Sequence, residues 1–128
     1  MARYLLRAEF YRTTLSLMRR GGGKIIPILE VSVFSDGELI DVPGRPTAVH
    51  APGHTPGNAA LFLTGCRVLF SGDTIVTRNP LTGQTGPQIM PSGFNLDTPA
   101  ALRSLSALHG LAADILLPGH GEPWTGGP

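Results

Sequence analysis

Three side chains that can bind a metal ion, those of His54, Asp73 and His120, each come directly after a glycine. Neutral imidazole and carboxylate groups are common protein ligands of catalytic metal ions. Each of these residues also follows an apolar run or a short strand-like segment, so the three lie where strands are expected to end. Glycine permits tight turns and close backbone approach to a ligand at such ends. The pattern predicts a metal site built from three loops.

Two further kinds of residue lie near these candidates. His50 is four residues before His54, but the stretch reads as a strand followed by a turn, where the helical i, i+4 geometry does not apply. We therefore expect a role other than metal binding for His50, with a substitute ligand as the alternative. The hydroxyls of Thr55 and Thr74 are expected to hydrogen-bond locally and to hold the loops that carry the ligands.

The charge of the chain is nearly balanced, with ten Lys and Arg against nine Asp and Glu among 128 residues. This balance gives no electrostatic reason to expect binding to nucleic acid or to an anionic membrane. Cys66 is the single cysteine, which excludes an intramolecular disulfide and makes a reducing cytoplasm the default location. The sequence contains no apolar run close to the roughly 20 residues that cross a bilayer. We expect a soluble single domain, or part of one, over residues 1–128.

The first half of the sequence predicts a helix followed by strands. Residues 1–20 carry apolar side chains at three- and four-residue spacing and end at three glycines, which predicts an amphipathic helix packed over the core. The β-branched run at 25–34 predicts a strand, and the Asp-Gly pair after it favours a tight hairpin to a return strand at 38–42. A further short strand is expected at 47–50.

The second half predicts a hairpin of strands at 59–63 and 67–71. Residues 75–95 lack periodicity and contain scattered Gly and Pro, which predicts a long loop that either faces a substrate or only connects. A last short strand is expected at 114–117.

A helix is expected near 98–111. Thr98 followed by Pro99 is a start signal, because a hydroxyl can cap the first turn and proline is tolerated there. The expected buried stripe consists of leucines at three-residue spacing, namely Leu102, Leu105, Leu108 and Leu111.

Four stretches of the sequence resemble the metallo-β-lactamase fold superfamily of metal-dependent hydrolases. They are DGELIDVPG at 36–44, PGHTPG at 52–57, LFSGDT at 69–74 and LLPGHGEP at 116–123. The resemblance implies an α+β fold, a four-layer αββα sandwich with mostly antiparallel or mixed sheets inside and helices outside. It also implies that His54 is the third histidine of a first metal site. Asp73 would then bridge both metals as the catalytic carboxylate, and His120 would end the second site.

The resemblance is to the C-terminal half of that sandwich. Members of the superfamily carry a His-x-His-x-Asp-His loop upstream, and this sequence has no such motif, since its first histidine is His50. One metal site would keep His54 and Asp73 as ligands, and the other would keep Asp73 and His120. Each site would therefore have two protein ligands, whereas catalytic zinc takes three protein ligands plus water. We expect a truncated gene product, a deliberately shortened piece, or a homodimer in which a second copy replaces the missing N-terminal half.

Two functions from different classes remain open. The first is hydrolysis of an ester, thioester, lactone, amide or phosphoester in a small-molecule substrate by a metal-activated water. The expected cofactor is zinc, as two ions in a complete site, with manganese or iron as alternatives. The second is a catalytically inactive remnant or an interaction module that needs a partner chain. The missing ligand loop favours the second for this chain, and the three downstream ligands favour the first for the protein from which it derives.

Overall fold

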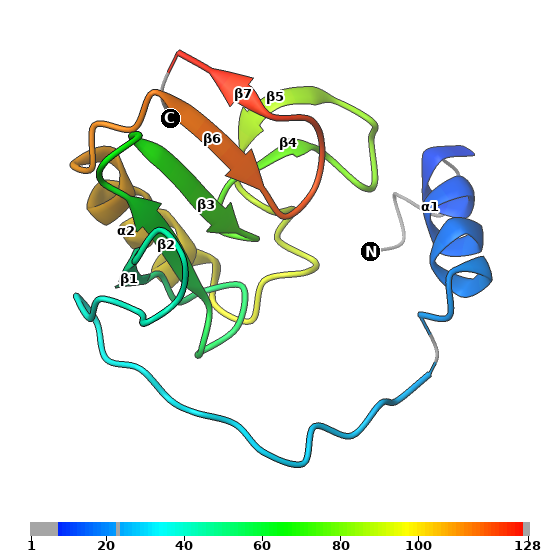
Figure 1. Cartoon of the computed structure of the whole chain (residues 1–128). Helices are drawn as coiled ribbons and strands as arrows, with labels where there is room; N and C mark the ends of the chain where they lie inside the picture. Colours follow the sequence, from blue (N-terminus) through cyan, green and yellow to red (C-terminus); the bar gives the residue numbers. More distant parts are fainter. Residues whose placement is uncertain (1–7, 23, 127–128) are drawn as a thin grey trace.

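The computed structural model describes residues 8–22 and 24–126. In these ranges the chain forms, in order, α1 (Ala8–Arg19), β1 (Thr47–His50), β2 (Ala59–Leu63), β3 (Val68–Gly72), β4 (Val76–Arg78), β5 (Thr85–Gln88), α2 (Thr98–His109), β6 (Ile115–Pro118) and β7 (Trp124–Thr125). Figure 1 shows one larger sheet with β4 and β5 beside it. The strands expected at 47–50, 59–63, 67–71 and 114–117 are confirmed to within about one residue.

The five-stranded sheet has the order β1-β2-β3-β6-β7. β2 runs antiparallel to both β1 and β3, whereas β6 runs parallel to β3. The strands β1, β3 and β6 therefore share one direction, and the chain leaves all three at the same edge of the sheet (Figure 1). The loops after these strands carry the predicted ligands. This mixed sheet with its two helices confirms the predicted α+β class.

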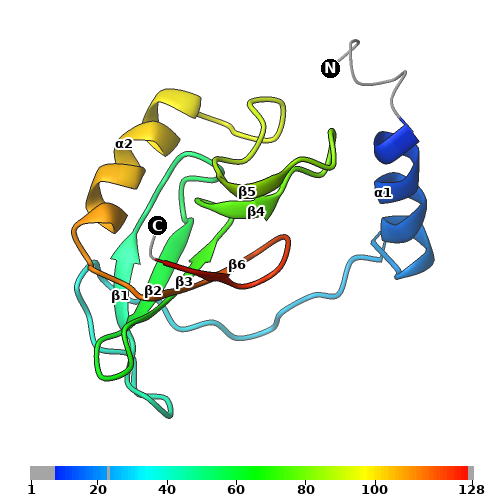
Figure 2. The same ribbon diagram turned by 90° about the horizontal axis from the view of Figure 1, so that it is seen from above.

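α2 packs on one face of the sheet (Figure 2). Phe62, Leu69 and Leu116 point from three neighbouring strands to this face, where they form the core with Leu108 of α2. The predicted leucine stripe is only partly right. Leu102 is 51% exposed, and the buried face of α2 consists instead of Ala101, Ser104 and Leu108. Small residues let the helix approach the loops below it closely.

The start of α2 also differs from the prediction. The Asp97 side chain is the N-cap, because its Oδ1 accepts a hydrogen bond of 2.9 Å from Ala100 N. Asp97 has the extended backbone that an N-cap requires, whereas Thr98 is already the first helical residue. Pro99 lies in the first turn, where backbone N–H groups have no acceptor within the helix, so the N–H that proline lacks is not needed.

The expectation of a structureless loop at 75–95 was wrong. β4 and β5 lie within it as an antiparallel pair. The Asn79 side chain organises the connection between them, because its Oδ1 accepts hydrogen bonds from Leu81 N and Thr82 N. These strands could not be recognised from hydrophobic periodicity, because each has only three or four residues and scattered glycines and prolines interrupt the stretch.

α1 confirms the predicted helix for residues 8–19, and residues 1–7 lie outside the described part of the chain. Its expected packing over the core was wrong. Tyr11, Leu17 and Met18 are each more than half exposed, and α1 stands apart from the five-stranded sheet (Figure 2). The Thr13 hydroxyl donates a hydrogen bond of 3.0 Å to Pro80 O, at the end of the β4–β5 unit. Within the described residues, neither helix is both long and apolar enough to cross a membrane.

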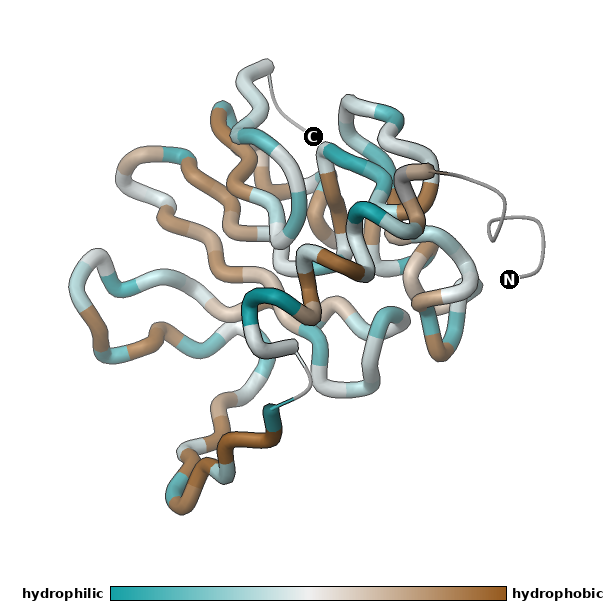
Figure 3. Tube along the Cα trace, turned by 90° about the vertical axis from the view of Figure 1, so that its right-hand side faces the viewer, coloured by the Kyte–Doolittle hydropathy of each residue, from teal (hydrophilic) through white to brown (hydrophobic). Residues whose placement is uncertain are grey.

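The strand expected at 25–34 was wrong as well. The structure assigns no strand there, and Ile25, Leu29 and Val33 are more than 90% exposed. A strand needs a hydrogen-bonded neighbour, and this segment lies beside none in the described chain. Figure 3 shows it as an apolar stretch that projects from the rest of the chain. The expected return strand at 38–42 is reduced to a single bridge between Leu39 and Thr47.

Candidate metal site

The loops after β3 and β6 are joined by backbone at the edge where both strands end. Gly72 pairs with Pro118 in the parallel register, and Gly119 N donates a hydrogen bond of 2.8 Å to Gly72 O. This places Asp73 and His120, the next residues along each loop, beside one another. The loop after β1 reaches the same edge, because β1 and β3 share one direction. The topology therefore assembles the site from three distant parts of the sequence.

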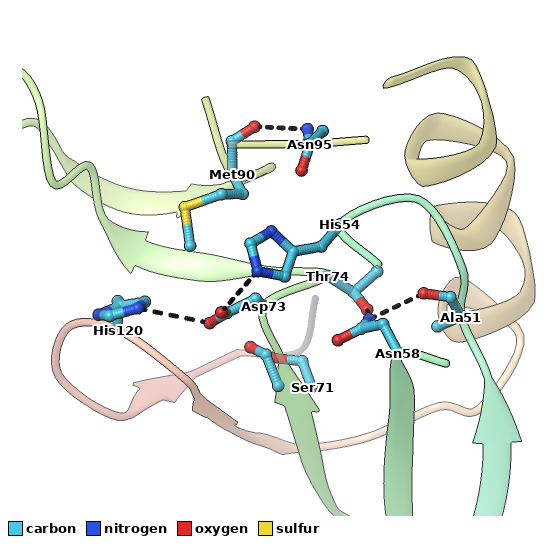
Figure 4. A network of polar contacts seen from close by, with 10 residues as sticks. Ala51, His54, Asn58, Ser71, Asp73, Thr74, Met90, Asn95 and His120 are labelled. Carbon is cyan, nitrogen blue, oxygen red and sulfur yellow. Dashed lines mark hydrogen bonds and ion pairs between the residues drawn. The ribbon is translucent and has the colours of Figure 1, made fainter. Parts of the chain in front are cut away.

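The structure brings together all three predicted ligands. His54 Nε2 lies 3.2 Å from Asp73 Oδ2, and His120 Nε2 lies 3.6 Å from Asp73 Oδ1. Figure 4 shows the Asp73 carboxylate between the two imidazoles. The side chains of His54 and Asp73 are about one quarter exposed, and that of His120 is 53% exposed. The site is thus open to solvent on the His120 side.

Two glycines are required for this arrangement. A Cβ on Gly119 would collide with Asp73 Oδ1 and with the backbone of Gly72. Gly53 has φ +137°, and a Cβ there would collide with the backbone of Ala101 at the start of α2. Glycine before His120 therefore makes room for the carboxylate, and glycine before His54 lets α2 support the loop.

Asn58 is a residue of the site that sequence reasoning missed. Its Nδ2 donates hydrogen bonds to Ala51 O at 2.8 Å and to Thr74 Oγ1 at 2.7 Å. These bonds tie both ends of the His54 loop to the residue after Asp73 (Figure 4). They agree with the expectation that Thr74 holds its loop. The available signal was the position of Asn58 directly after the PGHTPG turn, where amide side chains commonly bond to backbone.

The loop that carries His120 is held by β4. Thr77 N donates a hydrogen bond of 2.9 Å to His120 O, and the Thr77 hydroxyl donates to Glu122 O. Thr77 is 5% exposed, so these bonds lie out of water. The strand that sequence reasoning missed therefore fixes the third ligand loop.

His50 lies outside the group. Its ring Nε2 donates a hydrogen bond of 2.8 Å to Pro56 O, and its backbone N donates to Asp36 Oδ1 at 2.8 Å. The imidazole of His50 thus holds the turn through its bond to Pro56 O. This agrees with the expectation of a role other than metal binding.

The donors fit part of a two-metal site. An imidazole nitrogen faces each oxygen of Asp73, so each His–Asp pair could share one ion. The two imidazoles face different oxygens of the carboxylate. Within residues 8–22 and 24–126, no three His, Cys, Asp or Glu side chains are grouped to hold a single ion. Each half of the site offers two ligands.

A pocket of about 350 Å³ opens on these residues. One wall comes from α1 and the others from the loops around β4, β5 and α2. Apart from the three predicted ligands, the described lining residues are mostly apolar, namely Phe10, Leu17, Pro80, Leu81, Met90 and Phe94, together with Thr13 and Thr14.

Comparisons with known proteins agree with the fold and the motifs. The chain is 38% identical over 84 residues to "Probable metallo-hydrolase YflN" of Bacillus subtilis (strain 168). The matched stretch covers 61% of this chain and 32% of that protein. It resembles the crystal structure of the metallo-beta-lactamase family protein TTHA1429 from Thermus thermophilus, with a TM-score of 0.59 and 24% identity, over 93% of this chain and 42% of that one.

A second solved structure, that of TTHA1623 in a di-iron-bound form, matches with a TM-score of 0.57 and 30% identity, over 88% of this chain and 53% of that one. The chain thus spans about a third to a half of the length of these relatives. A family model described as the metallo-beta-lactamase superfamily matches residues 2–120. With that match across most of its length, and with the sheet and loops that the motifs predict, this chain belongs to the metallo-beta-lactamase superfamily.

Proposed function

We propose that this chain forms the downstream half of the active site of a metal-dependent hydrolase. The observation that carries the proposal is the position of the Asp73 carboxylate, with an imidazole nitrogen against each of its oxygens. Membership of the metallo-beta-lactamase superfamily and the similarity to a probable metallo-hydrolase support the same reading.

In this proposal His54 and Asp73 hold one metal ion, and Asp73 and His120 hold a second. A metal bound there supplies a water of lowered pKa and polarises the target oxygen. Asp73, the catalytic carboxylate of the proposal, would be the ligand that both ions share. Asn58 and Thr77 keep the ligand loops in place through the bonds described above.

Zinc is the proposed metal, as two ions in the complete site, with manganese and iron as alternatives. Imidazole and carboxylate ligands suit all three metals, so the donor set does not choose between them. The di-iron form of TTHA1623 supports iron as a serious alternative.

The proposed substrate is a small molecule with an ester, thioester, lactone or similar carbonyl bond. Support comes from the apolar walls of the pocket, to which Leu81, Met90 and Phe94 contribute. None of the described lining residues is Lys or Arg, the side chains that usually neutralise a phosphate. The pocket therefore favours a neutral carbonyl compound with an apolar group over a phosphoester.

Metal analysis of the purified chain tests this proposal, together with activity assays on an ester, a thioester, a lactone and a phosphodiester in added zinc or manganese. His54→Ala and Asp73→Ala serve as negative controls. We expect bound metal that both substitutions remove, and activity only in the presence of that metal. A chain with neither stoichiometric metal nor activity would show that these residues do not form a working site here.

The second candidate is an inactive remnant or an interaction module that needs a partner chain. Each half of the site has two ligands from this chain, fewer than a catalytic zinc takes. The sheet face opposite α2 also carries apolar side chains, because Leu61, Phe70 and Leu117 are aligned across β2, β3 and β6, and Phe70 is 41% exposed. We propose that this face packs against an N-terminal half or a second copy. Activity that appears only when a partner is added would favour this candidate.

The cytoplasm is the proposed location. Support comes from the single cysteine, which is exposed and free, since exposed thiols stay reduced in that compartment.

A further inference from the structure

Two buried polar atoms beside the candidate metal site have no hydrogen-bond partner among the described residues. They are Nδ1 of His54 and Oδ1 of Asn95. A buried donor or acceptor without a partner gives up its bonds to water and gains nothing in return, so such atoms are normally paired. An amide oxygen can only accept a hydrogen bond, whereas an imidazole nitrogen that carries hydrogen donates one. The two atoms are therefore complementary.

The backbone holds these two residues near one another. Leu96 N donates a hydrogen bond of 3.2 Å to His54 O, and the neighbouring residues form a second backbone bond of 2.9 Å. The Asn95 amide has a defined orientation, because its Nδ2 donates a hydrogen bond of 2.9 Å to Met90 O. With the nitrogen engaged there, the amide oxygen is on the side of the His54 ring (Figure 4).

In the structure these two atoms do not meet in hydrogen-bond geometry. We propose that Asn95 is a positioning residue, and that a small adjustment of the His54 ring lets Oδ1 of Asn95 accept a hydrogen bond from Nδ1–H of His54. Nδ1 then carries the hydrogen, and Nε2, which lies 3.2 Å from Asp73 Oδ2, is the ring atom left to bind a metal. Without an acceptor at Nδ1, the Asp73 carboxylate would favour the opposite neutral tautomer, with hydrogen on Nε2. Asn95 supplies a competing acceptor at Nδ1 and helps to fix the orientation of the ring.

The consequence for metal binding rests on the proposed function, but the location of the hydrogen on His54 does not. A ring with hydrogen on Nε2 must lose it before that nitrogen can bind a metal. A ring with hydrogen on Nδ1 presents a free lone pair at once. Asn95 would therefore strengthen metal binding without touching the metal.

Two substitutions separate the acceptor role of Asn95 from a role in loop structure. Asn95→Leu keeps a similar size but removes both the acceptor and the bond to Met90 O. Asn95→Asp keeps an oxygen acceptor for His54 but removes the donor to Met90 O. If Asn95 served only to hold the loop through Met90, the two substitutions would behave alike. Asn79→Leu, at an asparagine whose bonds lie between β4 and β5, is the control for general damage to this loop.

The first measurement is nitrogen NMR of the His54 ring in the metal-free chain of 128 residues, with its signals identified by their loss in His54→Gln. We expect hydrogen on Nδ1 in the wild type, in Asn95→Asp and in Asn79→Leu, and hydrogen on Nε2 alone in Asn95→Leu. The second measurement is titration with zinc. We expect binding about tenfold weaker in Asn95→Leu and undiminished in Asn95→Asp.

A bare Nδ1 in the wild type would overturn the proposal, and so would an unchanged His54 ring in Asn95→Leu. Equal effects of the Leu and Asp substitutions would assign Asn95 to loop structure and overturn it as well. Failure of every variant and of the wild type to bind zinc would contradict the proposed metal site, while the NMR result would still decide the role of Asn95.

Discussion

Asp73 connects the two histidines of the candidate site, and no second carboxylate of the described chain lies with them. Its two oxygens face different imidazoles, so under the proposed function removal of this one side chain would take a ligand from both halves of the site. The histidines, in contrast, each serve one half. Changes to Asp73, or to the space around its carboxylate, should therefore affect both histidines of the candidate site.

Asp73→Ala is expected to abolish stoichiometric metal binding, because each half of the site would keep a single imidazole. Metal content after purification and calorimetric titration with zinc are the measurements. Asp114→Ala is the matched control, since the Asp114 pair with Arg67 is 2.8 Å long but more than half exposed, and such surface pairs contribute about 0–1 kcal/mol. Retention of full metal content by Asp73→Ala would exclude a bridging role.

Gly119→Ala is expected to weaken metal binding by about tenfold or more, because the new methyl group would collide with the Asp73 carboxylate and with the backbone of Gly72. Gly57→Ala is the matched control, since a Cβ at Gly57 meets nothing within 4 Å. Zinc titration and circular dichroism of both variants make the comparison. Equal affinities would mean that the Asp73 side chain can relocate without loss.

The helix α2 supports the loop that carries His54. Ala101 contacts Gly53, and the Ser104 hydroxyl donates a hydrogen bond of 2.8 Å to Pro52 O. These contacts join the helix face to the start of the His54 loop. The stability of this loop therefore depends on the core that α2 shares with the sheet.

Leu108→Ala is expected to lower the free energy of unfolding by about 2–5 kcal/mol, because the side chain is fully buried in that core. Leu102→Ala, on the same helix but 51% exposed, should change it by about 0.5 kcal/mol or less. Urea denaturation of the two variants gives the comparison. Similar losses would contradict the observed orientation of α2.

The elements also explain how much the sequence could predict. Strands that end in a glycine turn, such as those before His54 and Asp73, were predicted correctly because hydrophobic pattern and turn chemistry agree there. The run at 25–34 has equally strong strand propensity, yet propensity cannot supply a neighbouring strand. Asn58 and Asn95 were missed because asparagine is common in loops, and its hydrogen-bond partners become visible only when distant loops meet.

The molecule leaves two apolar surfaces exposed to water, namely the segment at 25–34 and the sheet face around Phe70. Exposed patches of this kind promote association. Both agree with the proposal that this chain, which spans a third to a half of the length of its relatives, packs against further protein.

The isolated chain is therefore expected to self-associate, with an average mass by light scattering that rises with concentration. Leu29→Lys should reduce the association, because Leu29 is 94% exposed within the apolar segment. Leu96→Lys, at an exposed leucine elsewhere on the surface, should have little effect. A concentration-independent monomer mass for the wild type would remove the need for a partner.

The parallel pairing of β3 with β6 has a consequence for the order of folding. Val68 pairs with Ile115 across a long intervening stretch that includes β4, β5 and α2. Closing such a long loop costs conformational entropy before the two strands can pair. This cost delays the pairing relative to local hairpins and helices. The β2–β3 hairpin and α2 should form early during refolding, and Asp73 should meet His120 only in the last step.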